Sequence, residues 1–231
     1  MLGLVDFAEV QQLQRRIVYD VGEHGGPVLL LCEHAPTISI GRSGSRAHIG
    51  PDDEVLRSLG IRVYYVNRGD GCLLHLPGQL AAYLAMPLEV FGLNVQKYLD
   101  RLHSALVGVL EEFDIIARNR PERPGIFSGS ARIATVGIAV SRWIAYHGLT
   151  LNVGPHLELF DLLDEPGIGP APLRQTSMES RRQRPTPMAK VREALVRRIE
   201  DEFGLEQHHL YTHHPLIRRK VLSHAYAPSP G

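Results

Sequence analysis

The segment Arg132-Ile-Ala-Thr-Val-Gly137-Ile-Ala-Val-Ser141-Arg142-Trp143-Ile-Ala-Tyr-His147-Gly148-Leu-Thr-Leu-Asn152-Val153 combines β-branched apolar runs with glycines. Its ends, residues 132–140 and 149–153, have the content of strands. Glycine beside a strand lets a ligand or another backbone approach closely. The segment therefore predicts two strands that carry part of a pocket, with Trp143 in the core and His147 satisfying backbone groups at a strand end.

The rest of the chain alternates groups of strands with helices. Apolar positions at helical spacing predict helices over residues 7–21, 95–113 and 187–203, capped by Asp6, Asn94 and Thr186. Short apolar runs predict strands over residues 27–33, 37–40, 62–66 and 114–117, and strands within 72–88 joined by a turn at Pro77-Gly78. This order indicates a single α+β domain with a mixed β-sheet and flanking helices.

Composition excludes several classes of protein. The 231 residues carry 25 basic and 25 acidic side chains, so no basic excess favours nucleic acid. The apolar runs are far shorter than the roughly 20 residues of a membrane span, and the first residues lack a secretory pattern. Two cysteines without metal-ligand spacing give neither a disulfide framework nor a zinc site. We expect a cytoplasmic monomer without a metal.

Two further segments share the glycine, histidine and arginine content of the first. They are Glu33-His-Ala-Pro-Thr-Ile-Ser-Ile-Gly-Arg42 and Asn67-Arg-Gly-Asp-Gly-Cys-Leu-Leu-His-Leu-Pro-Gly-Gln-Leu80. Both lie at predicted strand ends or turns, where arginine and histidine supply hydrogen-bond donors. Together the three segments predict one binding pocket.

At these residues the chain resembles the lipoyl(octanoyl) transferases, a family of the biotin/lipoate protein ligase-like superfamily. Residues 67–80 resemble the family signature RGGxxTxHGPGQL, residues 132–153 resemble KIAxIGIxxSRWxxxHGxALNV, and residues 33–42 resemble EHPPxxTxGR. Phe160, the run Pro166-Gly-Ile168 and the run Thr176-Ser-Met178 follow the pattern FxxIxPCGI and then VTSM. The matches run in order from about residue 2 to about residue 205, and we assign residues 1–207 to this domain and 208–231 to a C-terminal extension.

The resemblance implies both a fold and a reaction. The fold is a mixed sheet with flanking helices, which agrees with the α+β prediction. The reaction moves an octanoyl group from the thioester of acyl carrier protein to a lysine of a lipoyl domain in 2-oxoacid dehydrogenase or glycine-cleavage proteins. Transfer of an acyl group from a thioester to an amide lowers the free energy, so the resemblance implies that the reaction needs no ATP and no other cofactor.

The resemblance also implies which residues bind the acyl group. These substrate-binding positions are Arg68, Gly69, Asp70, Gly71, Cys72, Leu73, Leu74, His75, Thr135, Val136, Gly137, Gly148, Leu149 and Thr150. Three of these positions depart from the family pattern: Asp70 replaces Gly, Leu73 replaces Thr and Thr150 replaces Ala. The neighbouring Leu76 also departs from it, since the family has Gly there. We expect Asp70 and Leu76 to narrow or reshape the pocket.

The family's catalytic pair is replaced in this chain. The cysteine of PCGI, which forms an acyl-thioester in the family, aligns with Pro166, and the lysine of KIA aligns with Arg132. Proline has no nucleophile, and arginine stays protonated at neutral pH. Two side chains are candidate substitutes: Cys72 as a nucleophile or a small core residue, and His75 as a contact to the acyl carbonyl, a general base or a turn-orienting residue.

Two hypotheses for the function follow. The first is a divergent octanoyltransferase that acts through His75, through Cys72 or by direct attack of the acceptor amine. The second is a non-catalytic homologue, a pseudoenzyme that binds acyl chains, acyl carrier protein or lipoyl domains.

Two charged clusters carry open alternatives. Arg181, Arg182 and Arg184 form either a solvated turn or a landing site for an acidic partner. The histidines at 208, 209, 213 and 214 are expected to be a solvated segment and not a metal site.

Overall fold

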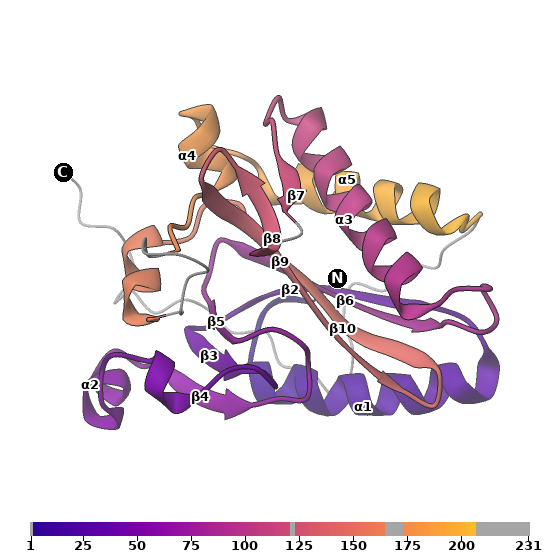
Figure 1. Ribbon diagram of the computed structural model, residues 1–231, viewed down its shortest axis with the longest axis horizontal. Coiled ribbons are helices and arrows are strands. Elements are labelled where there is room, and N and C mark those ends of the chain that lie inside the picture. Colours follow the sequence, from indigo (N-terminus) through magenta and orange to yellow (C-terminus); the bar gives the residue numbers. More distant parts are fainter. Residues whose placement is uncertain (1, 121–122, 165–172, 207–231) are drawn as a thin grey trace.

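The strands build two sheets, as a computed structural model of the chain shows for residues 2–120, 123–164 and 173–206 (Figure 1). In chain order the strands are β1 Gly3–Val5, β2 Val28–His34, β3 Thr37–Ile40, β4 Arg62–Tyr65, β5 Cys72–His75, β6 Gln79–Pro87, β7 Arg118–Arg120, β8 Arg123–Ser128, β9 Ala131–Ser141 and β10 Ile144–Asn152. The larger sheet has the order β1-β2-β6-β10-β9-β8-β7, and the smaller one β4-β3-β5. Each sheet contains one parallel pair, β1 with β2 and β3 with β4, beside antiparallel pairs. The predicted mixed α+β fold is confirmed.

Helices cover both faces of the larger sheet, and one short helix packs against the smaller sheet. The helices are α1 Phe7–His24, α2 Asp53–Ser58, α3 Val95–Glu112, α4 Met178–Arg182 and α5 Met188–Phe203. Helix α1 lies along one face, against β6 and β10, while α3 lies on the opposite face with α5 packed against it (Figure 1). The larger sheet is therefore the central layer of three.

Strand β6 belongs to two apolar cores at once. Leu80, Ala82, Leu84 and Met86 contact the cluster under α3 and α5, whereas Ala81 and Tyr83 contact the cluster under α1. Alternate side chains of a strand point to opposite faces, so both faces of β6 are buried. This explains why residues 80–87 of β6 form a continuous apolar run.

The smaller sheet has an apolar cluster of its own. Ile38 and Ile40 from β3 pack with Cys72 and Leu74 from β5 and with Leu56 from α2. The opposite faces of β3 and β5 turn toward the larger sheet, and the candidate site forms there.

Most helix predictions are confirmed, with one change at an end. Asp6 accepts a hydrogen bond from the amide of Ala8 at 2.9 Å, and Asn94 accepts one from Lys97 at 2.8 Å. Helix α1 continues through Gly22 and ends at Gly25, whose φ of 76° is the left-handed conformation that glycine adopts at low cost.

Several sequence predictions are wrong in detail. Residues 114–117 are not a strand, because Asp114 has a φ of 61° and the amide of Ile115 returns to the carbonyl of Leu110. The cap of α5 is Pro187, since the hydroxyl of Thr186 accepts a hydrogen bond from Arg182 instead. Trp143 lies at the β9–β10 turn with a φ of 60° and is 61% exposed, so it is not a core residue.

Other elements are longer or had no sequence prediction. The strand predicted over residues 149–153 begins at Ile144, and β1, β7, β8, α2 and α4 were not predicted. In the described part of the chain, no helix has the length and apolar content of a membrane span.

Gly148 is required where β10 passes β6. A Cβ at this position would overlap the carbonyl oxygen of Ala82 in the main chain of β6. We expect Gly148→Ala to destabilise the protein by about 3 kcal/mol, because two paired backbones would have to separate. Urea unfolding measures the change.

Gly26→Ala is the control, since a Cβ at Gly26 meets no atom within 4 Å. We expect its free energy of unfolding to change by less than about 1 kcal/mol. Equal effects of the two substitutions would contradict the steric explanation.

Candidate functional site

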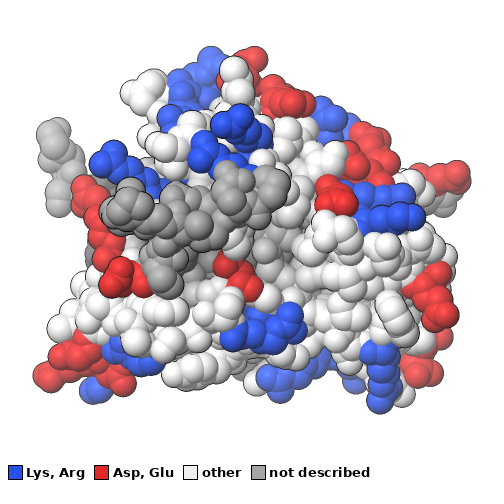
Figure 2. Space-filling model, in the orientation of Figure 1, with Lys and Arg blue, Asp and Glu red and all other residues white. Residues whose placement is uncertain are grey.

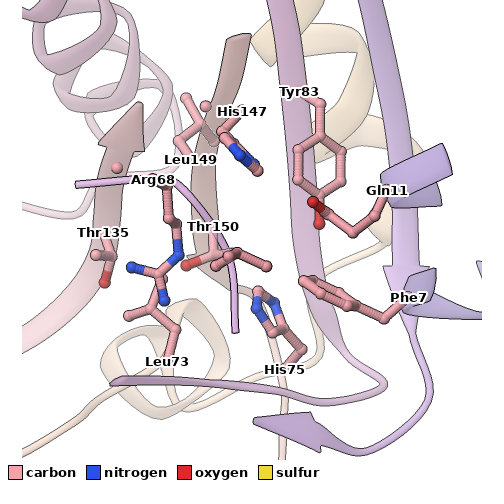
Figure 3. Close-up of a pocket in the computed structure, with 13 residues that line it drawn as sticks. Phe7, Gln11, Arg68, Leu73, His75, Tyr83, Thr135, His147, Leu149 and Thr150 are labelled. Carbon is pink, nitrogen blue, oxygen red and sulfur yellow. The ribbon is translucent and has the colours of Figure 1, made fainter. Parts of the chain in front are cut away.

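A cavity that is open to solvent on one side lies between the two sheets and α1 (Figure 3). Block 67–80 supplies Arg68, Leu73 and His75, and block 132–153 supplies a second wall. The residues of that second wall are Thr135, Gly137, His147, Gly148, Leu149 and Thr150. Two of the three segments predicted to form one pocket therefore meet at one site, whereas no residue of 33–42 lines it.

Six of the predicted substrate-binding residues lie outside this cavity. They are Gly69, Asp70, Gly71, Cys72, Leu74 and Val136. Gly69 and Asp70 instead shape the loop that carries Arg68: the amide of Gly69 donates to the carbonyl of Ile138 at 2.7 Å, and Asp70 has a φ of 73° and accepts from the amide of Gly71. These residues act on the cavity through the loop.

Neither Asp70 nor Leu76, which were expected to narrow or reshape the pocket, lines the cavity directly. Leu76 belongs to the apolar cluster of the smaller sheet. The departures that do line it are Leu73 and Thr150.

Cys72 lies on the far face of β5. Leu73 and His75 point into the cavity, so the alternation of a strand turns Cys72 away from it. Its Sγ donates to the carbonyl of Ser45 at 3.4 Å within the cluster of the smaller sheet, and the residue is fully buried. The structure therefore favours the core role for Cys72 over the nucleophile.

A hydrogen-bond network fixes Arg68 and His75. Nη2 of Arg68 donates to the carbonyl and to the hydroxyl of Ser39, both at 2.9 Å, and Ser39 Oγ lies 2.9 Å from Nε2 of His75. Arginine is only a donor, so we assign the Ser39 proton to His75 Nε2 and the imidazole proton to Nδ1. This tautomer makes His75 a donor and leaves it no open basic nitrogen.

Burial keeps the histidines of the site neutral. It holds the pKa of His75 well below 6.5, aided by the charges of His34 and Arg68. Burial, together with the nearby guanidinium groups of Arg68 and Arg42, lowers the pKa of His147 to about 4. At neutral pH the cavity contains one permanent cation, Arg68, beside uncharged imidazoles.

Arg132 is held near the beginning of β9. Its backbone bridges to Gln175, and Oε1 of Gln175 accepts from Nη2 and Nε of Arg132 at 2.9 and 3.2 Å. The register of β8 against β9 shifts between Ile126 and Phe127, which places a bulge beside Arg132. Arg132 thus anchors the segment that leads to α4, three residues before Thr135 of the cavity.

Four cavity residues were not predicted as site residues: Phe7, Gln11, Val66 and Tyr83. His147, predicted to be structural, also lines the cavity with a φ of 63°. Two features of the sequence could have identified Gln11 and Tyr83 as site residues. They are a glutamine on the apolar face of α1 and a tyrosine in the otherwise aliphatic run of strand β6.

Pro166 and the four C-terminal histidines lie outside the described residues. Within the described residues no three His, Cys, Asp or Glu side chains gather in a way that could hold a metal ion.

The family model of the lipoyl protein ligase A/B catalytic domain matches residues 6–200. The octanoyltransferase of Syntrophobacter fumaroxidans is 39% identical over 171 residues, 72% of this chain and 74% of the relative. That of Geobacter metallireducens is 34% identical over 199 residues, 86% of this chain and 89% of the relative. The chain belongs to the octanoyltransferase family. Its resemblance to that family at the sequence level is confirmed.

Solved structures support the fold of this octanoyltransferase-family chain. Lipoate-protein ligase A, solved with ATP, superposes with a TM-score of 0.69 at 16% identity, over 88% of this chain and 86% of the ligase. A bipartite lipoate protein ligase from Thermoplasma acidophilum gives 0.63 at 16% identity, over 93% and 88%. At such identities the likeness establishes the fold alone.

The low pKa of His147 predicts a loss of stability in acid. The unfolded chain binds a proton near the ordinary value of 6.5, but the folded chain binds it only near about 4. Stability is therefore fully present above 6.5 and falls as the pH drops toward 4. Asparagine tolerates the positive φ of this position, so His147→Asn removes the titrating group at little cost in backbone strain. Between about pH 7 and pH 5, we expect this variant to lose about 1 to 2 kcal/mol less free energy of unfolding than the wild type loses.

Urea unfolding of both proteins across this pH range provides the measurement. Parallel pH profiles for the wild type and His147→Asn would contradict a buried neutral His147.

Proposed function

We propose that this chain transfers an octanoyl group from acyl carrier protein to a lysine of a lipoyl domain, as a cytoplasmic monomer that needs no cofactor. The observation that carries the proposal is the cavity between the sheets, where two of the family's sequence blocks meet. Membership of the octanoyltransferase family supports the same reaction.

The cavity suits an acyl chain that enters from the side of Arg132. Thr135 and Thr150 are paired across β9 and β10, and Gly137 and Gly148 form the next pair further in on the same face. Arg132 precedes Thr135 on β9, and Pro166 precedes the segment that Arg132 anchors. We therefore place the thioester carbonyl at the threonine pair and the chain beyond the glycine pair.

The chemistry that we propose needs no protein nucleophile. The acceptor lysine, as a free amine, attacks the carbonyl carbon; the new C–N bond forms, the C–S bond breaks, and the carrier thiolate takes up the proton that the amine releases. Nδ1 of His75 and the guanidinium of Arg68 supply donors to the cavity, which would stabilise negative charge on the carbonyl oxygen. Pro166 and Arg132 stand at the family's catalytic positions without that chemistry.

A second candidate function is favoured by Arg132 itself. Its guanidinium is engaged by Gln175 and cannot accept a proton, so the chain can be a non-catalytic homologue that binds acyl groups or lipoyl domains.

A transfer assay distinguishes the two candidates. With octanoyl acyl carrier protein and an unmodified lipoyl domain, we expect the mass of the domain to increase by one octanoyl group. His75→Ala should lower the rate at least about tenfold, since it removes a donor to the developing charge. Cys72→Ser should leave the rate within about twofold.

The other outcomes assign the function differently. Binding of the acyl carrier without acylation of the domain supports the second candidate and rejects the first. Loss of transfer in Cys72→Ser with a retained fold would restore the cysteine mechanism.

The partners are proposed to dock at the end of the molecule that carries α4. Arg182 lies over the ring of Phe113 and beside a groove that Arg184, Lys190 and Arg197 also line. Lys and Arg side chains lie near the top of the view in Figure 2 with acidic side chains beside them, and Glu112 and Glu193 line the groove together with its four basic residues. An acidic carrier or lipoyl domain would be attracted to this groove.

Charge reversal tests this surface. We expect Arg184→Glu with Lys190→Glu to weaken binding of acyl carrier protein about tenfold at low salt, with less effect at high salt. Arg57→Glu, an exposed position on α2, is the control. Equal weakening by both changes would show only a net-charge effect.

A further inference from the structure

The inner end of the cavity carries an amide that lacks a partner. Gln11, from the second turn of α1, lines the cavity and its side chain lies beside the ring of Tyr83 (Figure 3). Nε2 of Gln11 is buried and makes no hydrogen bond with the described residues. A buried donor left without an acceptor costs about 1 to 3 kcal/mol, so the position is costly unless a ligand uses it.

The neighbouring polar groups do not satisfy this amide. The hydroxyl of Tyr83 lies 2.7 Å from Nε2 of His34, and the oxygen of Gln14 accepts from the backbone amide of His147. The imidazole of His147, neutral at pH 7, lines the same cavity. A neutral imidazole presents one donor and one acceptor, so His147 adds hydrogen-bonding capacity to the inner part of the cavity.

Gln11 belongs to the end of the cavity remote from Arg132. Tyr83, beside Gln11, is paired with Gly148, whereas the residue paired with Thr150 is Ala81, two positions earlier in β6. With the thioester carbonyl at the threonine pair, as the proposed function has it, Gln11 faces the far part of the acyl chain. A plain hydrocarbon would cover the amide without giving it an acceptor.

We propose that the cavity takes, besides an octanoyl group, an acyl group of the same length with a hydroxyl or similar hydrogen-bonding oxygen near its far end, and that it binds this second group more tightly. The oxygen accepts from Nε2 of Gln11, and a hydroxyl can also donate to an acceptor in the same part of the cavity. This inference rests on the proposed function for the direction of the chain, and it makes Gln11 a specificity-determining residue.

Binding of two neutral thioesters tests the inference without catalysis. The probes are the N-acetylcysteamine thioesters of octanoic acid and of ω-hydroxyoctanoic acid, titrated by calorimetry. The wild type should bind the hydroxylated probe about three- to tenfold more tightly, which is the contribution of one net hydrogen bond. Gln11→Leu should reverse the preference.

Gln12→Leu is the matched control, because Gln12 is exposed on the same helix. It should retain the preference of the wild type. Gln11→Met repeats the reversal with a second apolar side chain, and thermal unfolding checks that each variant folds.

Each other outcome overturns a specific statement. The inference is overturned if the wild type binds the octanoyl probe as tightly as the hydroxylated probe, or more tightly. It is also overturned if Gln11→Leu weakens the binding of both probes equally, because Gln11 would then contact the carbonyl end of the acyl chain. Binding of neither probe by any variant overturns the acyl site and with it the proposed function.

Discussion

The buried guanidinium of Arg68 joins the two sheets and so creates the space between them. It donates to Ser39 of the smaller sheet and to the carbonyl of Gly69, whose amide is bonded to Ile138 of the larger sheet. A charge removed from water must be surrounded by acceptors, which fixes the loop from Arg68 to Gly71 against both sheets. Gly137 lies under this loop, where a Cβ would approach the carbonyl oxygen of Gly69 to 2.9 Å.

This cation also determines what chemistry the cavity supports. A neighbouring positive charge and burial both disfavour protonated histidine, so His75 and His147 remain neutral donors or acceptors. Ser39 occupies the basic nitrogen of His75. The cavity is therefore equipped to hold and polarise a carbonyl group, while a nucleophile has to come from the second substrate.

Local patterns in the sequence were sufficient for most of the fold. Capping by Asp6 and Asn94 and helical periodicity placed α1 and α3, and the Pro77-Gly78 turn correctly separated β5 from β6. The edge strands β1 and β7 escaped prediction because each has three residues and takes its stability from pairing with a neighbour. Thr186 failed as a cap because its hydroxyl accepts a hydrogen bond from Arg182, four residues earlier, instead of one from a backbone amide of α5.

The site was predicted in outline but not in its orientation. The glycine, histidine and arginine blocks identified both walls, yet block membership did not reveal that Cys72 and Leu74 face away from Leu73 and His75. That distinction depends on which face of β5 meets the larger sheet. Phe7, Gln11 and Tyr83 belong to elements whose patterns report only helix and strand, and three-dimensional packing alone brings them to the cavity.

The two-sided burial of β6 has a consequence for cooperativity. The cluster beneath α3 and the cluster beneath α1 share this strand, as they also share its neighbour β2, and β6 pairs with both β2 and β10. Neither helical layer can lose its packing while the strand keeps its register for the other. The layers therefore unfold together as one unit, and local opening is confined to elements that β6 does not touch, such as α2.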